Sequence, residues 1–287
     1  MAGRICLVKH VVISKMVYSF MVYLWPPSMI KFINFMMMNF VWSGNIMERK
    51  IITAPWKNCC MPQALGGLGI KNMLLFNQSL QAKFLWRLVN KKLASLDFLR
   101  SRFIEKILAR NMNYMESLIW NGLKSVFQKI HLNCHWIINA NSSLNLWHMN
   151  WTGERLIYWV SPLDPRINHD ILIRGQLEIL DLLPDDIAAI ASSHEFISQD
   201  DLLIWDQSMN FHLDSKIFYN HIFQGDRKWI GNFKKKWISP SRFTLVWRLL
   251  INKLLVDVNL QQIGISLCSR CALCHQNRED VDHLFLS

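Results

Sequence analysis

Three residues near the C-terminus have types and a spacing that could bind a metal ion. Cys271 and Cys274 are separated by two residues, and His283 follows nine positions after Cys274. Thiolate and imidazole groups suit zinc, which takes four ligands at a structural site. Cys268 and His275 are the candidates for the fourth ligand, although both are sterically awkward. The spacing alone leaves two interpretations open: a zinc site, or free thiols.

Short helices must position these ligands. The stretch “SRFTLVWRLLINKLLVDVNLQQIGI” predicts an apolar helix pair directly before the cysteines, and “EDVDHLFL” predicts a helix that presents His283 back to the Cys271–Cys274 turn. If zinc binds, we expect it to clamp these last helices together, because none of the ligands suggests an open catalytic position.

Helical periodicity dominates the first half of the chain. Residues 5–25 predict an amphipathic helix, and a second helix is expected to start at Pro27 and to end before Gly44. The stretch “GGLGI” lacks the residues of a phosphate-binding loop and predicts a tight turn. Further helices are expected in “NMLLFNQSLQAKFLWRLVNKK”, “SLDFLRSRFIEKILARN” and “YMESLIWNGLKSVFQKI”.

The middle of the chain carries β signals. In “CHWIINANSSLNLWHMNW”, two short β-prone runs surround “NANSS”, which predicts a hairpin. “SPLDPRINHD” is the best candidate for a domain boundary, and “DLLIWDQSMNFHLDSKIFYNHIF” predicts a strand, a turn and a helix. We therefore expect a mainly α protein with small β-hairpins, of the α+β type.

The charge balance favours an acidic partner. The chain has 32 Lys and Arg against 21 Asp and Glu, a net charge of +11, which suits nucleic acid. Basic and aromatic residues alternate in “KFLWRLVNKK” and “FKKKW”. This pattern suits a surface that contacts phosphates and stacks on bases, but ordinary solvated helix faces show it as well. Thirteen Trp and fourteen Met favour a large core over a stacking surface. The candidate phosphate contacts are Lys83, Arg87, Lys91, Lys92, Lys234, Lys235 and Lys236.

Seven cysteines in a chain of this length do not suggest a disulfide framework. Cys59 and Cys60 are adjacent and cannot readily bridge, so we expect core thiols. The apolar N-terminal stretch is interrupted by Lys9, His10 and Lys15, which leaves an uncharged run shorter than the about 20 residues that span a bilayer. We expect an intracellular protein of the nucleus or cytoplasm with no membrane partner.

The tail resembles a known family signature. “CALCHQNREDVDHLFLS” is similar to the Cys-Pro-Leu-Cys-Gly…Glu…His-Leu-Phe…Cys pattern of the reverse-transcriptase zinc-binding domain in plant-type non-LTR (LINE-like) retrotransposons. In that family the last Cys lies five residues after the His, which here is the position after Ser287. The resemblance implies a zinc module whose last ligand lies one position beyond this sequence.

Upstream segments resemble the same family in the same order. They are “APWKNCCMPQALGGLGIKNMLLFNQSLQAKFLWRL”, “DLLIWDQSMNFHLDSKIFYNHI” and “FTLVWRLLINKLLVDVNLQQIGI”, in which Leu255 and Val256 replace the family's usual Pro-Thr. The resemblance implies a helical region after the polymerase core (1–125), a β-hairpin and linker (126–165), and a helical zinc-binding domain (166–287).

No catalytic set of this family is expected in the chain. A reverse transcriptase holds metal ions on palm carboxylates, which the family carries in an aromatic-x-Asp-Asp hairpin. The Asp pairs here, Asp185-Asp186 and Asp200-Asp201, lack the aromatic residue and are expected to be helix caps or surface charges. We therefore expect no enzyme activity and no small-molecule substrate.

The resemblance implies a non-catalytic retrotransposon-derived fragment that binds one structural zinc and nucleic acid, either RNA or DNA. Two alternatives remain open at this point: a domesticated domain that binds another protein, and a decayed reading frame without function. Nothing in the sequence indicates an oligomeric state.

Overall fold

The chain divides into two compact units, each described here by itself. Unit 1 comprises Met1–Met16, Pro26–Leu74 and Gln224–Ser287, and unit 2 comprises Val17–Trp25 and Leu75–Phe223. This computed structural model describes residues 1–48, 51–90, 94–104, 117–139, 142, 144, 145, 147–159, 185, 188, 189, 200–223 and 239–285.

The chain begins with a helix of three consecutive parts: α1 (Ala2–Leu7), a π-helical turn (Val8–Val12) and α2 (Ile13–Val22). This is the helix predicted for residues 5–25. Over Ala2–Val22 it is long and apolar enough to cross a membrane by length and composition alone, a test that buried core helices and N-terminal signal sequences also pass. The absence of a membrane partner stays a prediction.

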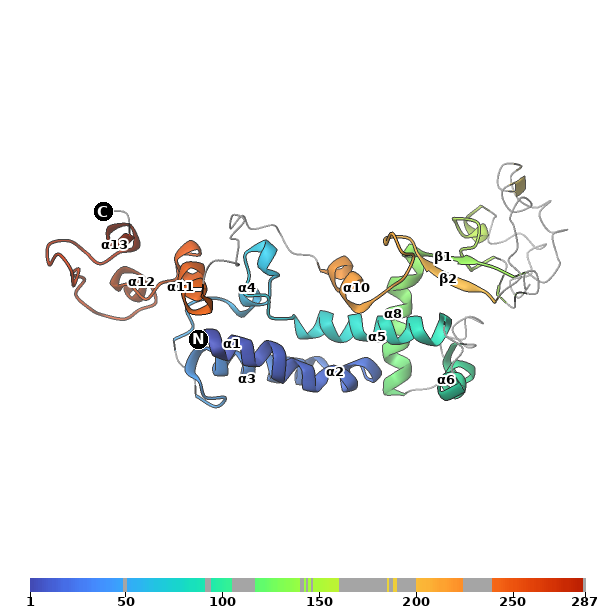
Figure 1. The fold of residues 1–287 in the computed structure, drawn as a ribbon, viewed down its shortest axis with the longest axis horizontal. Coiled ribbons are helices and arrows are strands. Elements are labelled where there is room, and N and C mark those ends of the chain that lie inside the picture. The colour runs from blue at the N-terminus through green and yellow to red at the C-terminus, as the bar shows by residue number, and fades with distance from the viewer. Residues whose placement is uncertain are drawn as a thin grey trace. The chain divides into compact units, whose positions relative to one another are not determined.

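Helix α3 (Pro27–Ser43) lies beside α1 in unit 1 (Figure 1). It starts at Pro27 and ends before Gly44, as predicted, and Gly44 has a φ of 89° that glycine adopts without strain. Arg4 of α1 donates from Nη1 to the carbonyl oxygen of Val41 at 3.1 Å. A cation at the end of α3 also suits the negative pole of that helix.

The glycine-rich stretch follows a short helix, α4 (Trp56–Cys59), and a 3-10 turn (Gln63–Leu65). Gly66 has a φ of 83° and Gly69 a φ of 69°, which confirms a tight turn. At Gly67 an added Cβ would stand 2.1 Å from the carbonyl oxygen of Met61. The turn therefore needs glycine for close backbone approach, and no phosphate has to be invoked.

The C-terminal part of unit 1 contains α11 (Pro240–Leu250), α12 (Asp257–Gln262) and α13 (Val281–Phe285). The predicted helix pair is present as α11 and α12. Trp247 of α11 is buried and donates from Nε1 to the Gly66 carbonyl oxygen at 2.9 Å. The guanidinium of Arg248 lies 5.0 Å from the ring centre of Trp42. These contacts attach α11 to helix α3 and to the glycine-rich turn of its own unit.

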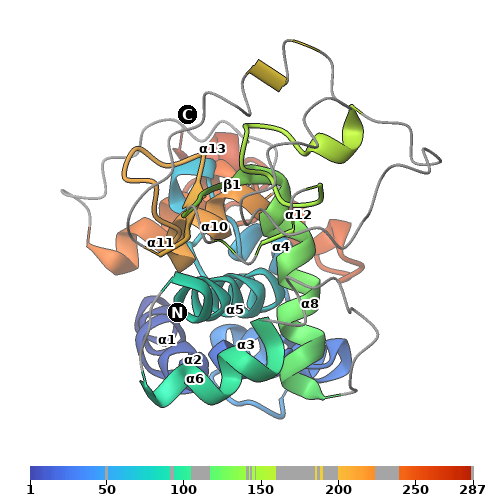
Figure 2. The same ribbon diagram turned by 90° about the vertical axis from the view of Figure 1, so that its right-hand side faces the viewer.

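Unit 2 contains most of α5 (Met73–Asn90), then α6 (Ala94–Leu99), a π-helical turn (Arg100–Ile104), α8 (Leu118–Ile130), a 3-10 turn (His131–Asn133), β1 (Cys134–Ile137), a 3-10 turn (Leu156–Tyr158), β2 (Leu202–Trp205) and α10 (Ser215–Ile222). Helix α8 crosses α5 at a steep angle in Figure 1, and Figure 2 shows α8 lengthwise beside α5 seen end-on. The fold is mainly α with a small antiparallel sheet, as predicted.

The sheet has two strands that are far apart in sequence. Cys134 pairs with Trp205 and Ile137 pairs with Leu202 in antiparallel register. The predicted strand at 134 is present, and its ladder partner is β2. Among the described residues, the hairpin predicted around “NANSS” is reduced to single bridge residues, Asn139 and Asn145, and to a hydrogen bond from the Trp136 amide to the Asn150 carbonyl oxygen at 2.7 Å. The strand, turn and helix predicted around α10 are present.

Tryptophan fills the core of unit 2, which confirms the core interpretation for most of these residues. Side chains at most 6% exposed come from α5, α8, both strands and the segment after β1. The tryptophans among them are Trp86, Trp120, Trp136, Trp147, Trp151 and Trp205. Burial of such large apolar surfaces is the main source of stability in this unit.

Candidate metal centre

Cys271 and Cys274 lie in a turn that is closed by backbone hydrogen bonds. The Cys271 amide donates to the Asn277 carbonyl oxygen at 2.7 Å, and the His275 amide donates to the Cys271 carbonyl oxygen at 2.9 Å. The Cys271 side chain is buried, whereas Cys274 is exposed. The turn thus places one thiol inward and one at the surface.

Backbone amides point at the Cys274 sulfur. Hydrogen bonds from the amides of Asn277 and then Gln276 lower the pKa of Cys274 from 9.0 to about 6, and side-chain hydrogen bonds with His283 and Cys271 contribute less. The Gln276 amide nitrogen lies 3.4 Å from Sγ. The loop therefore favours the thiolate at neutral pH, and the thiolate is the form that binds metal.

Helix α13 brings His283 to the cysteines. The carboxylate of Asp280 accepts a hydrogen bond from the His283 amide at 2.7 Å, which satisfies one free donor at the start of this short helix. His283 Nε2 lies 3.1 Å from Cys274 Sγ. The helix predicted from “EDVDHLFL” is present and directs the imidazole to the turn.

The three predicted ligands form one cluster. The ligand atoms of Cys271, Cys274 and His283 all lie within 4.8 Å of one another. Around a tetrahedral zinc, with Zn–S near 2.3 Å and Zn–N near 2.0 Å, ligand atoms stand roughly 3.5–3.8 Å apart. Two sulfurs and one imidazole can therefore surround zinc after small shifts: Cys274 Sγ and His283 Nε2, now 3.1 Å apart, would separate slightly, and any pair near the 4.8 Å limit would move closer.

Neither predicted fourth ligand belongs to this cluster among the described residues. Cys268 is exposed. His275 has a φ of 58°, a left-handed conformation that is unusual for a residue with a Cβ. Its backbone is engaged on both sides, because its carbonyl oxygen also accepts a hydrogen bond from Arg270 Nε at 2.7 Å.

The loop around the cluster is attached to α12 by polar contacts that the sequence did not single out. The Val258 amide donates to the Glu279 carbonyl oxygen at 3.3 Å, and the Arg270 amide donates to the Asp257 carboxylate at 3.3 Å. Asp280 is the supporting residue that the sequence does indicate, because it stands three residues before His283, where an acidic side chain can cap the start of a helix.

The predicted phosphate contacts are only partly described. Lys83 and Arg87 lie one turn apart on α5, and both are half-buried. Lys91, Lys92 and Lys234–Lys236 lie outside the described residues.

Cys59 and Cys60 are free and buried, as predicted, and burial raises the pKa of each thiol to about 12.

Comparison with known proteins places the similarity at this end of the chain. Residues 214–287 match the family described as “zinc-binding in reverse transcriptase”. This range contains all three clustered ligands, so the predicted similarity to a reverse-transcriptase zinc-binding domain is confirmed for these residues, and its assignment to plant-type non-LTR elements stays a prediction.

One relative is a protein of Arabidopsis thaliana named “Putative ribonuclease H protein”, which is 32% identical over 91 residues. The alignment covers 32% of this chain and 15% of the relative, so the chain spans a small part of that protein's length. No solved structure matches the chain.

Proposed function

We propose that Cys271, Cys274 and His283 hold one structural zinc ion that organises the tail of a retrotransposon-derived protein. The observation that carries this proposal is the cluster itself, whose three ligand atoms lie within 4.8 Å of one another. The turn supplies two sulfur ligands and α13 supplies a nitrogen ligand, so one ion would fix the position of α13. A mixed Cys and His set of this kind is typical of structural zinc.

Zinc stoichiometry on the purified chain tests this proposal. We expect one tightly bound zinc in the natural chain or in a version with one cysteine added after Ser287, and none after Cys274→Ser. Cys6→Ser is the matched control, because Cys6 is also exposed and lies outside the cluster. Cys268→Ser and His275→Gly report whether either side chain is the fourth ligand.

The outcomes separate the alternatives. Zinc bound only by the extended chain assigns the fourth position to the added cysteine. Zinc bound equally by both chains, and lost on Cys268→Ser, assigns it to Cys268. Absence of zinc from both chains, or equal zinc content in Cys274→Ser and Cys6→Ser, would overturn the proposal.

We also propose that the chain binds nucleic acid and has no catalytic activity of its own, as part of a non-LTR element. The net charge of +11 supports binding to phosphates. The Asp201 carboxylate accepts hydrogen bonds from the Asn139 amide at 2.8 Å and from Ser142 Oγ at 2.9 Å. A carboxylate held in this way stabilises a loop, which supports a structural rather than a catalytic role for Asp201.

Salt dependence tests the nucleic-acid proposal. If Lys and Arg neutralise phosphates, the logarithm of the affinity for single-stranded oligonucleotides falls linearly with the logarithm of salt concentration, and each lost contact lowers the slope by about 1. Binding to a protein through apolar surface would lack this slope. The product of a decayed reading frame would bind neither nucleic acid nor a protein partner. Fluorescence anisotropy between low and physiological salt measures the slope.

A further inference from the structure

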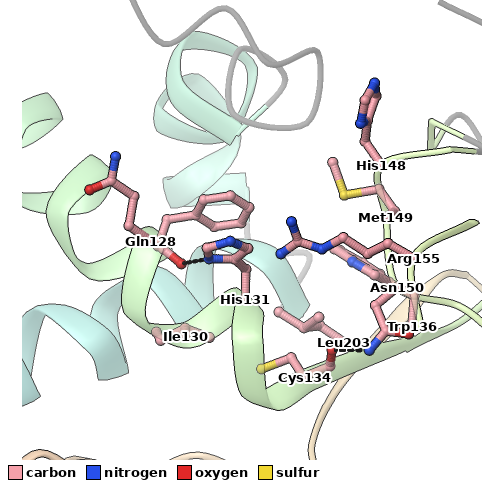
Figure 3. A pocket seen from close by; sticks show the side chains of 11 residues that line it. Gln128, Ile130, His131, Cys134, Trp136, His148, Met149, Asn150, Arg155 and Leu203 are labelled. Atoms are coloured by element: carbon pink, nitrogen blue, oxygen red, sulfur yellow. Dashed lines mark hydrogen bonds between the residues drawn. The ribbon is translucent and has the colours of Figure 1, made fainter. Parts of the chain in front are cut away.

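A cavity of about 410 Å³ lies in unit 2, remote in sequence from the zinc ligands. Its walls come from the end of α8, the turn after it, β1, the segment at His148–Asn150, Arg155 and Leu203 of β2 (Figure 3). This volume falls within the range of small-molecule pockets, about 300–1,000 Å³. The cavity is therefore large enough for one nucleotide-sized group.

One wall carries a cation. Arg155 is half-buried, and its guanidinium lies 5.6 Å from the ring centre of Tyr158. No ion pair of Arg155 is present among the described residues. Figure 3 shows the guanidinium pointing across the cavity toward His131. A planar guanidinium in this position suits a phosphate or carboxylate, which it can bind through two parallel N–H groups.

The opposite wall carries an acceptor. His131 Nδ1 lies 3.0 Å from the Phe127 carbonyl oxygen, and because a carbonyl can only accept, Nδ1 carries the hydrogen. Burial, followed by the charge of Arg155, lowers the pKa of His131, so the ring is neutral near pH 7. In that tautomer Nε2 has a free lone pair. The imidazole thus offers an acceptor to a ligand with N–H groups.

Asn150 fixes part of the cavity wall. Its Nδ2 donates to the Cys134 carbonyl oxygen at 3.0 Å, which sets the orientation of the amide. Its Oδ1 is fully buried, so a ligand in the cavity cannot reach this oxygen. Asn150 therefore shapes the cavity and is not a ligand contact.

Aromatic rings complete the lining. The rings of Phe127 and His131 stack with centres 5.4 Å apart and planes 12° from parallel. Trp136 lines the same cavity and is 6% exposed. Flat rings beside a cation and an acceptor fit a ligand that is itself planar, anionic at one end and equipped with an N–H donor.

Two other uses of these residues are unfavourable. A Cys–His pair for nucleophilic chemistry would need a thiolate, but burial raises the pKa of Cys134. A metal cation in the cavity would lie near the Arg155 guanidinium and be repelled by it. An unpaired nucleotide, in contrast, carries a phosphate, a planar ring and N–H groups on its base edge.

We propose that this cavity receives one unpaired nucleotide of a single-stranded nucleic acid, with its phosphate on Arg155 and a base donor on His131 Nε2. This inference rests on the proposed nucleic-acid function and assigns it a place. Recognition through base edges and stacking requires an unpaired base, so single strands should bind more tightly than duplexes.

The test uses the full chain with zinc present and a fluorescent single-stranded RNA of about ten nucleotides. Arg155→Gln is compared with Arg242→Gln, which removes the same charge from an exposed position on α11. We expect Arg155→Gln to weaken binding roughly tenfold more than Arg242→Gln, because it removes a bidentate phosphate contact as well as a charge.

A second measurement does not depend on the folding of any variant. The natural chain is photo-crosslinked to the same RNA carrying 4-thiouridine, and the adducts are mapped by mass spectrometry. We expect adducts on peptides that contain Phe127–Trp136 or His148–Arg155. Adducts confined to other peptides, or equal losses from Arg155→Gln and Arg242→Gln, would overturn the cavity inference while leaving nucleic-acid binding intact. Absence of binding at low salt would overturn both proposals.

Discussion

The tail of unit 1 and the core of unit 2 are ordered by different forces. Between Asp257 and Phe285, Cys271 is the single buried side chain, and it is a predicted zinc ligand. Unit 2 instead buries a continuous cluster that includes six tryptophans, among them Trp147 and Trp205 at 0% exposure. Hydrophobic burial can therefore stabilise unit 2 alone, whereas the tail has too little apolar surface to offset its conformational entropy.

This difference indicates that the tail, and not unit 2, would depend on a bound metal ion. When a short segment has polar contacts and no core, metal binding supplies its folding free energy. The hydrogen bonds of Cys271, Asp280 and Arg270 hold the loop in a ligand-ready geometry, but exposed hydrogen bonds each contribute only about 0.5–1.5 kcal/mol. The account makes the tail conditional on zinc and unit 2 independent of it.

The largest expected effect is the loss of tail structure on zinc removal. After chelation we expect amide protection to disappear across residues 257–285 and to remain in α8 and β1, because the two regions have different sources of stability. Hydrogen exchange with mass spectrometry measures both regions in one sample. Equal amide protection of the tail with and without chelator would contradict the claim that zinc stabilises the tail.

The reciprocal change acts on the core. Trp205 is fully buried and packs edge-on against Phe218, with ring centres 6.0 Å apart. Trp205→Ala should lower the free energy of unfolding by about 3 kcal/mol or more without changing zinc affinity. Met209→Ala, at a position 99% exposed, should change it by less than about 0.5 kcal/mol. Urea unfolding measures the free energies, and zinc titration of the same variants measures the affinity. Loss of zinc binding in Trp205→Ala would contradict the account.

Acidification should destabilise the tail through Cys274. The folded-state pKa of Cys274 is lowered from 9.0 to about 6, so its contribution to the folded loop is fully present above about 9 and is lost as pH falls through about 6. Bound zinc competes with protons for the same thiolate, so we expect zinc to be retained at neutral pH and released only below about 6. Zinc content after dialysis across this range measures the midpoint, and release already at neutral pH would be inconsistent with a preformed thiolate site.

The smallest expected effect separates backbone strain from ligation. His275 has a φ of 58°, and glycine adopts this conformation without the penalty that a Cβ imposes. His275→Gly should stabilise the zinc-bound tail by at most about 1 kcal/mol, because relief of about 1–2 kcal/mol of left-handed strain is partly offset by the about 0.5–1 kcal/mol entropic cost of glycine. Slower hydrogen exchange or a lower zinc dissociation constant measures this change. A large fall in zinc affinity would instead identify His275 as a ligand.

The sequence predicted those features that local spacing determines. Pro27 and Gly44 mark the ends of α3, and “EDVDHLFL” forms the helix that carries His283, because caps and periodicity act within a few residues. The clustering of Cys271, Cys274 and His283 follows from the same short range.

Long-range features were not accessible to this reasoning. β1 pairs with a strand more than 60 residues away in the sequence, and no local pattern specifies that partner. The cavity beside Arg155 also combines α8, β1 and β2. Its signals are an arginine without an ion pair in the part of the chain that the structure describes and a histidine whose Nδ1 is held by a backbone carbonyl, and both exist only in the folded chain.

The most direct measurement is zinc-edge X-ray absorption on the zinc-loaded full chain. The account predicts a shell with at least two sulfur atoms near 2.3 Å, from Cys271 and Cys274, and imidazole nitrogen near 2.0–2.1 Å, from His283. A shell of oxygen and nitrogen atoms without sulfur would contradict the central claim that this cluster binds zinc.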